Sequence, residues 1–196
     1  MTRGLVALAA LATLAAPGST AAKGKQPDLL PFSLAVEVRW GSGNGPEAFR
    51  ADVERAVATA AAHGCVAEIS TGASAASGGT SDLVLVATLE GFVEELRFDD
   101  SLATAVTPGE PTKELRRVAM VDVDNTLQLY VREGAREVAT KSFHAGVQYR
   151  PMYVGEEPQV SARARVIEDI VDESRKLLCK SGGKLAARVR GEPGAR

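Results

Sequence analysis

The chain has 196 residues, of which 45% are hydrophobic and 24% are charged, and its formal net charge is −2. This length is typical of one domain, and the ordinary apolar fraction excludes a wholly disordered chain, a coiled coil and a collagen-like repeat. The near-neutral charge removes the electrostatic basis for nucleic acid as the main partner. Aromatic residues make up only 5% of the chain, so a core must consist mainly of aliphatic side chains.

The first 22 residues are predicted to be a secretory signal peptide. Arg3 is the only charge in residues 1–22, an apolar run follows over 5–16, and the small residues 19–22 offer cleavage sites, which is the pattern of an export signal. The run is shorter than the roughly 20 residues that cross a bilayer. No cysteine follows it as a lipid attachment point. We therefore expect an exported, soluble protein, periplasmic or extracellular, that is not a lipoprotein. Its mature chain is expected to begin with a flexible start over 23–30 and to lack a transmembrane segment.

Two cysteines remain after the predicted cleavage, Cys65 and Cys179. In an oxidising compartment, an isolated pair of cysteines is more often a disulfide than a metal site or a reactive thiol. The chain offers no matching histidine ligands for zinc and no CxxC redox motif. We predict a Cys65–Cys179 disulfide, which would stabilise the fold by roughly 4–5 kcal/mol because it closes a long loop in the unfolded chain. The alternative is a pair of small buried hydrophobic residues at helix ends.

The mature chain opens with a predicted strand and a predicted helix. Residues 33–40 alternate between apolar and polar side chains, which predicts a strand with one polar face. After a glycine-rich break, Pro46 is expected as the first residue of a helix over 46–64, whose apolar residues recur at helical spacing. A short strand over 66–70 follows. Residues 71–81 contain only Gly, Ala, Ser and Thr, a composition typical of a flexible loop.

A long strand is predicted over residues 82–98. Gly91 breaks its alternation, which indicates a β-bulge or a bend at that residue. Residues 101–112 contain two prolines and a glycine, so they are expected to be a further loop.

Residues 118–131 and 137–149 are predicted to form a β-hairpin. The turn over 132–135 contains Gly134, where a positive φ angle is expected. In the first strand of this hairpin, every second residue is apolar, so one side is expected to face the core and the other side solvent. The side chains expected to face solvent are those of Asp122, Asp124, Thr126 and Gln128.

The last predicted helix covers residues 167–178 and is stopped by two glycines. The element order over residues 31–180 is therefore β-α-β-β-β-β-α. Two amphipathic helices on one face of a mostly antiparallel sheet make a single α+β domain, a two-layer sandwich. Residues 181–196 are predicted to be a disordered basic tail. Its positive charges would contact an anionic lipid or polymer surface weakly, at roughly 1 kcal/mol each.

The segment 118–127 resembles the DxDxT signature of haloacid-dehalogenase-type phosphohydrolases. In that family the first aspartate attacks the phosphoryl group, the second is the general acid and base, and Mg²⁺ bridges substrate and carboxylates at the C-terminal edge of a strand. The resemblance implies that Asp122 would be the nucleophile and Asp124 the acid and base. The signature normally opens a doubly wound parallel domain, whereas a hairpin and one helix follow it here. A solvated strand face is therefore the favoured interpretation.

The remaining candidates for chemistry are isolated. His63 and His144 lie far apart in the sequence, and a lone histidine is more often a surface or packing residue than a catalyst. Gly41, Gly43 and Gly45 lie between a predicted strand and a helix, but their spacing does not fit a dinucleotide-binding loop. The chain has no G-x-S-x-G elbow, Walker loop or HExxH motif. We therefore predict no catalytic, cofactor-binding or metal-binding residues and no cofactor.

The order of elements resembles that of small periplasmic and outer-membrane-associated envelope proteins. The resemblance rests on the helix over 46–64, the strand over 82–98 followed by a loop, the hairpin segment 127–139 and the helix over 167–178. Proteins of this kind include the lipopolysaccharide-assembly lipoprotein, the curli-secretion lipoprotein and the amino-terminal domain of the Tol-system propeller protein. The resemblance implies a fold, and fold analogy alone does not transfer function.

The expected function is that of an exported, non-enzymatic cell-envelope protein. It would bind a partner protein or an envelope polymer through its sheet or an exposed edge strand, and no nucleic acid partner is expected. The alternative from a different class is a Mg²⁺-dependent phosphohydrolase that uses Asp122 and Asp124.

Overall fold

The computed structural model describes residues 30–63, 66–71, 81–104, 113–152, 156–179 and 182–191. The predicted signal peptide, Cys65 and most of the predicted loop over 71–81 lie outside this part of the chain. In chain order the elements are β1 (Leu30–Trp40), α1 (Glu47–Ala62), β2 (Val66–Thr71), β3 (Leu83–Thr104), β4 (Lys113–Val131), η1 (Glu133–Ala135), β5 (Arg136–Tyr149), α3 (Pro158–Cys179) and α4 (Gly182–Arg190).

The five strands form one sheet in the order β2-β1-β3-β4-β5. β1 lies between β2 and β3 and is parallel to both, whereas β3, β4 and β5 form an antiparallel meander with longer ladders. The parallel neighbours β1 and β2 are joined through α1, because parallel strands need a crossover connection. The predicted α+β class and the predicted order of elements along the chain as far as α3 are confirmed, and the antiparallel ladders dominate the sheet.

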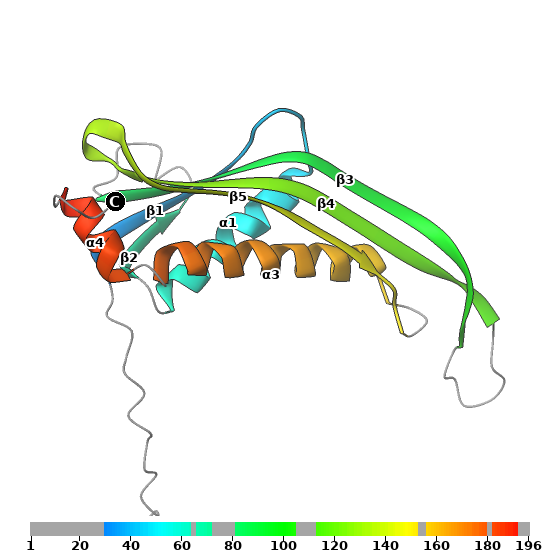
Figure 1. The fold of residues 1–196 in the computed structure, drawn as a ribbon. Helices are drawn as coiled ribbons and strands as arrows, with labels where there is room; N and C mark the ends of the chain where they lie inside the picture. Colours follow the sequence, from blue (N-terminus) through cyan, green and yellow to red (C-terminus); the bar gives the residue numbers. More distant parts are fainter. Residues whose placement is uncertain are drawn as a thin grey trace, which may run out of the picture.

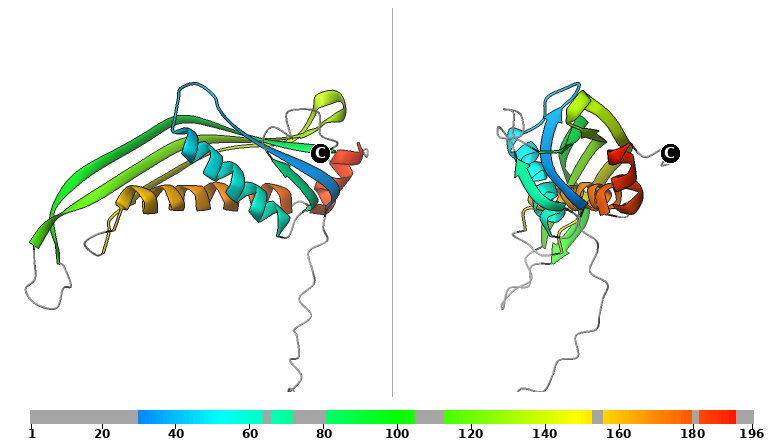
Figure 2. Two further views of the ribbon diagram at one scale, coloured as in Figure 1. Left: turned by 180° about the vertical axis from the view of Figure 1, so that it is seen from behind. Right: turned by 90° about the vertical axis from the view of Figure 1, so that its left-hand side faces the viewer.

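α1 and α3 cover one face of the sheet (Figure 1), and the reverse view in Figure 2 shows both helices on that same side. α1 packs against β1, β2 and α3, and α3 packs against β4 and β5. Among the described elements, none lies over the opposite face of the sheet. Each strand therefore presents every second side chain to the helices and the others to solvent.

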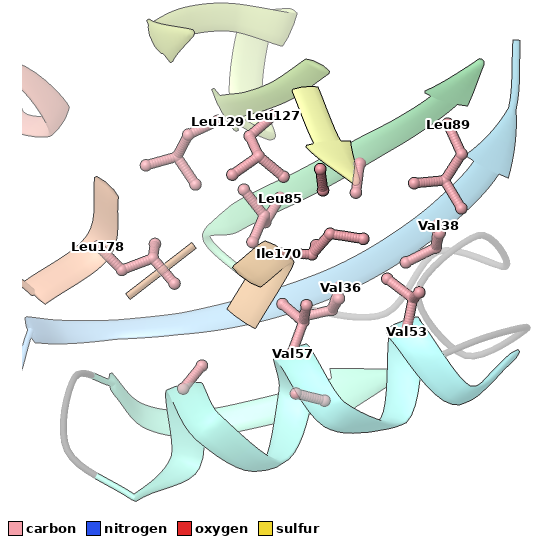
Figure 3. Close-up of a cluster of buried hydrophobic side chains, with 14 of the residues drawn as sticks. Val36, Val38, Val53, Val57, Leu85, Leu89, Leu127, Leu129, Ile170 and Leu178 are labelled. Atoms are coloured by element: carbon pink, nitrogen blue, oxygen red, sulfur yellow. The ribbon is translucent and has the colours of Figure 1, made fainter. Parts of the chain in front are cut away.

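The core lies between the sheet and these two helices (Figure 3). It is aliphatic, as the composition requires. Near the start of α1 a small aromatic cluster adds to it, in which the ring centroids of Phe49 and Phe92 lie 5.0 Å apart and those of Trp40 and Phe92 lie 5.8 Å apart. The aliphatic side chains labelled in Figure 3 are all at most 2% exposed and are those of Val36, Val38, Val53, Val57, Leu85, Leu89, Leu127, Leu129, Ile170 and Leu178.

Several element boundaries differ from the prediction. Pro46 has an extended backbone (φ −62°, ψ 126°) and is the N-cap of α1, not its first helical residue. α3 begins at Pro158, well before the predicted start at residue 167. β3 continues to Thr104, into the segment predicted as a loop, because β4 begins at Lys113 and pairs with it there.

The predicted disordered tail is wrong for residues 182–190, which form α4. Leu185 is 1% exposed and joins the core cluster. The guanidinium of Arg136, at the start of β5, donates hydrogen bonds to the carbonyl oxygens of Arg188 and Val189 at 3.0 and 2.8 Å. These carbonyls lie at the C-terminal end of the helix, where a cation also interacts favourably with the helix dipole.

Two glycine predictions are confirmed. Gly91 has φ +61°, and the β3–β4 ladder shifts its register between Glu90 and Val93, which is the expected bulge. Gly134 has φ +75° in the turn between β4 and β5. Both residues adopt the left-handed backbone conformation that glycine accepts most readily.

Past Leu89, β3 is an edge strand, and from Arg97 onward it pairs with β4 alone as a two-stranded ribbon; we call residues 90–104 and 113–118 the arm. β1 pairs with β3 only as far as Leu89, and β5 pairs with β4 only from Ala119 onward. Figure 1 shows the ribbon curving away past the N-terminal end of α3. In the described part of the chain, no third strand is paired to either edge of the arm.

Candidate functional site

The side of the sheet that points away from α1 and α3 carries polar side chains on three neighbouring strands, and we call this surface the polar face. It is formed by alternate residues of β3, β4 and β5, because successive side chains of a strand point to opposite sides. Its members are Thr88, Glu90, Asp122, Asp124, Thr126, Gln128, Thr140, Ser142 and His144.

His144 lies between two carboxylates of β4. Its Nδ1 atom is 3.0 Å from Oδ1 of Asp124, its direct neighbour across the β4–β5 ladder. Its Nε2 atom is 3.5 Å from Oδ1 of Asp122. The side chains of Asp122 and Asp124 are 30% and 70% exposed. An exposed ion pair contributes at most about 1 kcal/mol to stability, so this cluster is a feature of the surface and not a support of the core.

Gly146 allows this cluster to form. It is the direct neighbour of Asp122 in the β4–β5 ladder. A Cβ atom at this position would overlap Oδ1 of Asp122 and would lie 2.8 Å from Nε2 of His144. Any side chain larger than hydrogen would therefore displace the Asp122 carboxylate from the imidazole.

The polar face continues on both sides of the cluster. Glu90, opposite Asp124 on β3, turns toward the loop after β1, where a backbone N–H donates to its Oε1 atom at 3.4 Å. One row further along the strands, the hydroxyls of Thr126 and Ser142 are 3.0 Å apart. The set therefore consists of carboxylates, hydroxyls, one amide and one imidazole on the water-exposed side of the sheet.

This arrangement provides ion pairs and hydrogen bonds to a molecule that lies on the sheet. In the described part of the chain, no hydroxyl or thiol is hydrogen-bonded to His144, so the imidazole has no adjacent nucleophile to activate there. The same residues contain no group of three or more His, Cys, Asp and Glu side chains that could hold a metal ion.

The DxDxT segment lies in a different structural context from that of the phosphohydrolase signature. Asp122 and Asp124 lie inside β4, with antiparallel neighbours on both sides. The signature instead requires aspartates at the C-terminal edge of a parallel sheet. The orientation expected from alternation is confirmed, because Val121, Val123 and Leu127 are 0% exposed on the helix side, whereas the two aspartates reach solvent.

His144 is the residue of this site that the sequence analysis did not place. The turn closes with Val131 opposite Arg136, and a register shift between Leu129 and Tyr130 then brings Asp124 opposite His144. A regular hairpin continued from that turn would place Asp124 opposite the residue that precedes His144, so alternation and turn position do not predict this pair.

Only one of the two predicted disulfide cysteines lies in the described part of the chain. Cys179 is the last residue of α3 and packs, partly buried, against the core cluster. Cys65 lies outside the described residues. The Cys65–Cys179 disulfide therefore stays a prediction.

A separate cavity of about 400 Å³ lies near α4. At its edge, the backbone N–H and the hydroxyl of Ser33 both donate to Oδ2 of Asp82 at 2.9 Å, and these bonds hold the pKa of Asp82 below its usual range. The lining of the cavity contains apolar side chains and charges of both signs, so it does not favour one chemical class of ligand. The lining residues are Phe32, Ser81, Asp82, Val131, Arg132, Glu133 and Val189.

No protein-family model matches the sequence, and no curated protein matches it. Solved structures do resemble the fold. A Helicobacter pylori protein, described as a homolog of a neuraminyllactose-binding hemagglutinin, is 13% identical, with a TM-score of 0.50 over 87% of this chain and 95% of that one. A Xanthomonas campestris protein of the DUF330 family is 11% identical, with a TM-score of 0.47 over 86% and 92% of the two chains. A minor lipoprotein from Acinetobacter baumannii is 13% identical, with a TM-score of 0.41 over 76% and 93%.

These likenesses concern the fold. Structures described as lipoproteins occur among the matches, at TM-scores of 0.41 and below. The expectation that this protein is not itself a lipoprotein stays a prediction, because the described residues begin at Leu30. None of the helices in the described segments has the length and apolar character that a membrane crossing requires.

Proposed function

We propose that this protein is an exported, non-enzymatic component of the cell envelope that binds a partner protein or an envelope component through the polar face. The observation that carries the proposal is the oriented, water-accessible cluster of Asp122, Asp124 and His144 on the helix-free side of the sheet. Side chains that are already held in place lose less conformational entropy when a partner binds. Export is supported by the predicted signal peptide over residues 1–22.

The charges of the polar face support a cationic surface on the partner. Glu90, Asp122 and Asp124 are close neighbours on β3 and β4, and the carboxylate of Asp124 is 70% exposed. Arginine or lysine groups of a partner would form charge-assisted hydrogen bonds with these carboxylates. Complementary charge of this kind contributes mainly to specificity and to the rate of association.

A pull-down that compares the wild type with variants of the polar face tests the proposal directly. The mature protein, immobilised, is exposed to the envelope fraction of its own organism, and retained species are identified by mass spectrometry. The double variant Asp122→Asn/Asp124→Asn is expected to lose the species that the wild type retains. Asp52→Asn is the matched control, because Asp52 is 53% exposed on α1, on the helix side of the sheet, and it should retain them.

Gly146→Ala provides a second variant that leaves the charge of the polar face unchanged. The added methyl group displaces the Asp122 carboxylate, so weaker retention is expected although the protein stays folded by circular dichroism. Equal retention by the wild type, the double variant and Gly146→Ala would show that the polar face does not bind the partner.

The phosphohydrolase alternative is tested by phosphate release from an aryl phosphate, with and without Mg²⁺. No release above the buffer background is expected, because Asp122 and Asp124 lie inside an antiparallel ladder. Mg²⁺-dependent turnover that Asp122→Asn abolishes would overturn the binding proposal in favour of this enzyme class.

A further inference from the structure

Large exposed hydrophobic side chains are concentrated on one segment of β3 in the arm. Val93, Leu96 and Phe98 are 42%, 40% and 69% exposed. This segment lies past Leu89, where the pairing of β1 with β3 ends. Its other edge is paired with β4, so one row of backbone N–H and C=O groups points away from the sheet. Such an edge is a template for another strand.

The other edges of the sheet carry features that discourage pairing. β2 has only six residues, and short edge strands pair poorly. β5 carries Lys141, which turns toward the helix side and forms an ion pair with Glu173 of α3. An inward-pointing lysine is a common protection of edge strands. The β3 edge of the arm also carries an inward-pointing charge, Glu94, which is paired with Arg163 of α3, but this strand is much longer than β2 and exposes three large apolar side chains.

The charges of this β3 segment are self-complementary. Glu95 and Arg97 lie on the same side of the strand and form an ion pair with each other. Glu94 lies on the opposite, helix side, where Arg163 of α3 donates to its Oε1 atom at 3.1 Å. Leu96 and Phe98 follow Glu94 by two and four residues and therefore share the helix side with it.

We propose that the β3 edge binds a second copy of this chain, through antiparallel pairing about a two-fold axis at Leu96. In this register Glu95 lies opposite the partner's Arg97, and Arg97 lies opposite the partner's Glu95. Leu96 lies opposite the partner's Leu96, and Phe98 lies opposite the partner's Glu94 and diagonal to the partner's Leu96. Opposite charges and apolar groups in facing positions stabilise a strand pair. The contact is isologous and closes as a dimer.

The charges favour this register over an axis at either adjacent residue. An axis at Glu95 or at Arg97 would place two like charges directly opposite each other, which is destabilising. An axis at Leu96 avoids both conflicts and gives two ion pairs between the copies. The two sheets then continue into each other, with the helices of both copies on the same side, because a two-fold axis within one sheet is perpendicular to it.

Two single variants and their mixture test the proposal. Glu95→Arg makes both positions basic, and Arg97→Glu makes both acidic. Each variant alone should dimerise more weakly than the wild type, by on the order of tenfold in Kd, because like charges then face each other. An equimolar mixture should form a heterodimer with an affinity close to that of the wild type. Both variants lack the Glu95–Arg97 ion pair within their own chain. That ion pair therefore cannot explain why the mixture dimerises more tightly than either variant alone.

Analytical ultracentrifugation with one variant fluorescently labelled gives the species in each sample. Arg117→Glu, on the β4 strand of the arm, is the control and should dimerise as the wild type does. A wild-type chain that stays monomeric at 100-fold the concentration used for the retention measurements would overturn the proposal, and so would single variants that dimerise like the wild type.

Loss of the dimer in Arg117→Glu would show instead that β3 binds β4 of the next copy, which overturns the two-fold arrangement. Residues 95 and 97 are not among the residues changed in the retention measurements, so dimerisation and partner binding are measured with separate variants.

Discussion

Asn125 faces the core side of β4, where it lies between the aliphatic residues Val123 and Leu127 along the strand. It is 2% exposed, and its Nδ2 atom donates to the carbonyl oxygen of Val123 at 3.1 Å. Its Oδ1 atom has no hydrogen-bond partner among the described residues. A buried acceptor without a partner costs free energy, because it has lost its hydrogen bonds to water.

Replacing this amide with an aliphatic side chain of similar size should therefore stabilise the fold. We expect Asn125→Leu to raise the free energy of unfolding by about 1 kcal/mol, measured by urea denaturation. Gln128→Leu, on the polar face of the same strand, is the control and should stay within about 0.5 kcal/mol of the wild type. A loss of stability in Asn125→Leu would mean that the bond to the Val123 carbonyl outweighs the unpaired oxygen.

Asp82 links the start of β3 to β1 and should make the free energy of unfolding depend on pH. The two hydrogen bonds from Ser33 hold its folded pKa below the usual value, so its contribution is present above the unfolded pKa of about 4. That contribution is lost as the pH falls through the lower folded pKa. We expect Asp82→Asn to be less stable than the wild type by about 1 kcal/mol at pH 7.

The difference between these two proteins should shrink toward zero as the pH is lowered below 3, when the wild-type carboxyl is also protonated. Urea denaturation at a series of pH values measures it. Asp52→Asn, an exposed change on α1, is the control. A difference that is independent of pH would mean that the Asp82 charge has no part in the effect.

At the scale of elements, α3 anchors the helix layer to the sheet. Ile170 is 0% exposed at the middle of its buried side (Figure 3), and α3 packs against β4, β5 and α1. Ile170→Ala leaves a cavity and is expected to lower the free energy of unfolding by about 3 kcal/mol. Val160→Ala, 58% exposed on the same helix, should change it by less than about 0.5 kcal/mol. Thermal or urea unfolding of the two variants provides the comparison, and similar values for both would contradict this account of α3.

The elements that could be predicted from sequence are those with strong periodicity. β1, α1 and the β4–β5 hairpin follow from alternation, helical spacing and the turn glycine Gly134. The first turns of α3 could not be predicted, because their buried residues, Pro158 and Ala162, are small and give a weak hydrophobic pattern. The outer part of β3 depends on pairing with β4, a contact that no local pattern records.

The candidate site could likewise be predicted only in part from the sequence. The outward position of Asp122 and Asp124 follows from alternation along one strand. Their contact with His144 requires the register of two strands, and the approach of Asp122 requires the missing side chain at Gly146. α4 was also beyond local prediction, because its position depends on Arg136 of β5 and on burial of Leu185.

At the scale of the whole molecule, the predicted disulfide would join the two main helices. The C-terminal ends of α1 and α3 lie at the same end of the molecule (Figures 1 and 2). α1 ends at Ala62, three residues before Cys65, and Cys179 ends α3. This placement supports the pair, whose bond would stabilise the fold by roughly 4 kcal/mol in the chain-entropy model.

Intact-mass measurement after alkylation without reductant tests this bond in the exported protein. We expect no added mass without reductant and two alkyl groups after reduction and denaturation. The reduced protein should unfold at a lower urea concentration than the oxidised one. Two alkylated thiols in the denatured, unreduced protein would contradict the prediction.

The central place of β1 has a consequence for how this chain folds. β1 leaves the ribosome first, yet its partners on both sides, β2 and β3, follow later in the chain. The β4–β5 hairpin needs only a short turn and can pair within microseconds, whereas the parallel pairing of β1 with β3 is non-local and slow. Until then both edges of an apolar strand stay open to other chains. The first strand to be synthesised is therefore among the last to be paired on both of its edges.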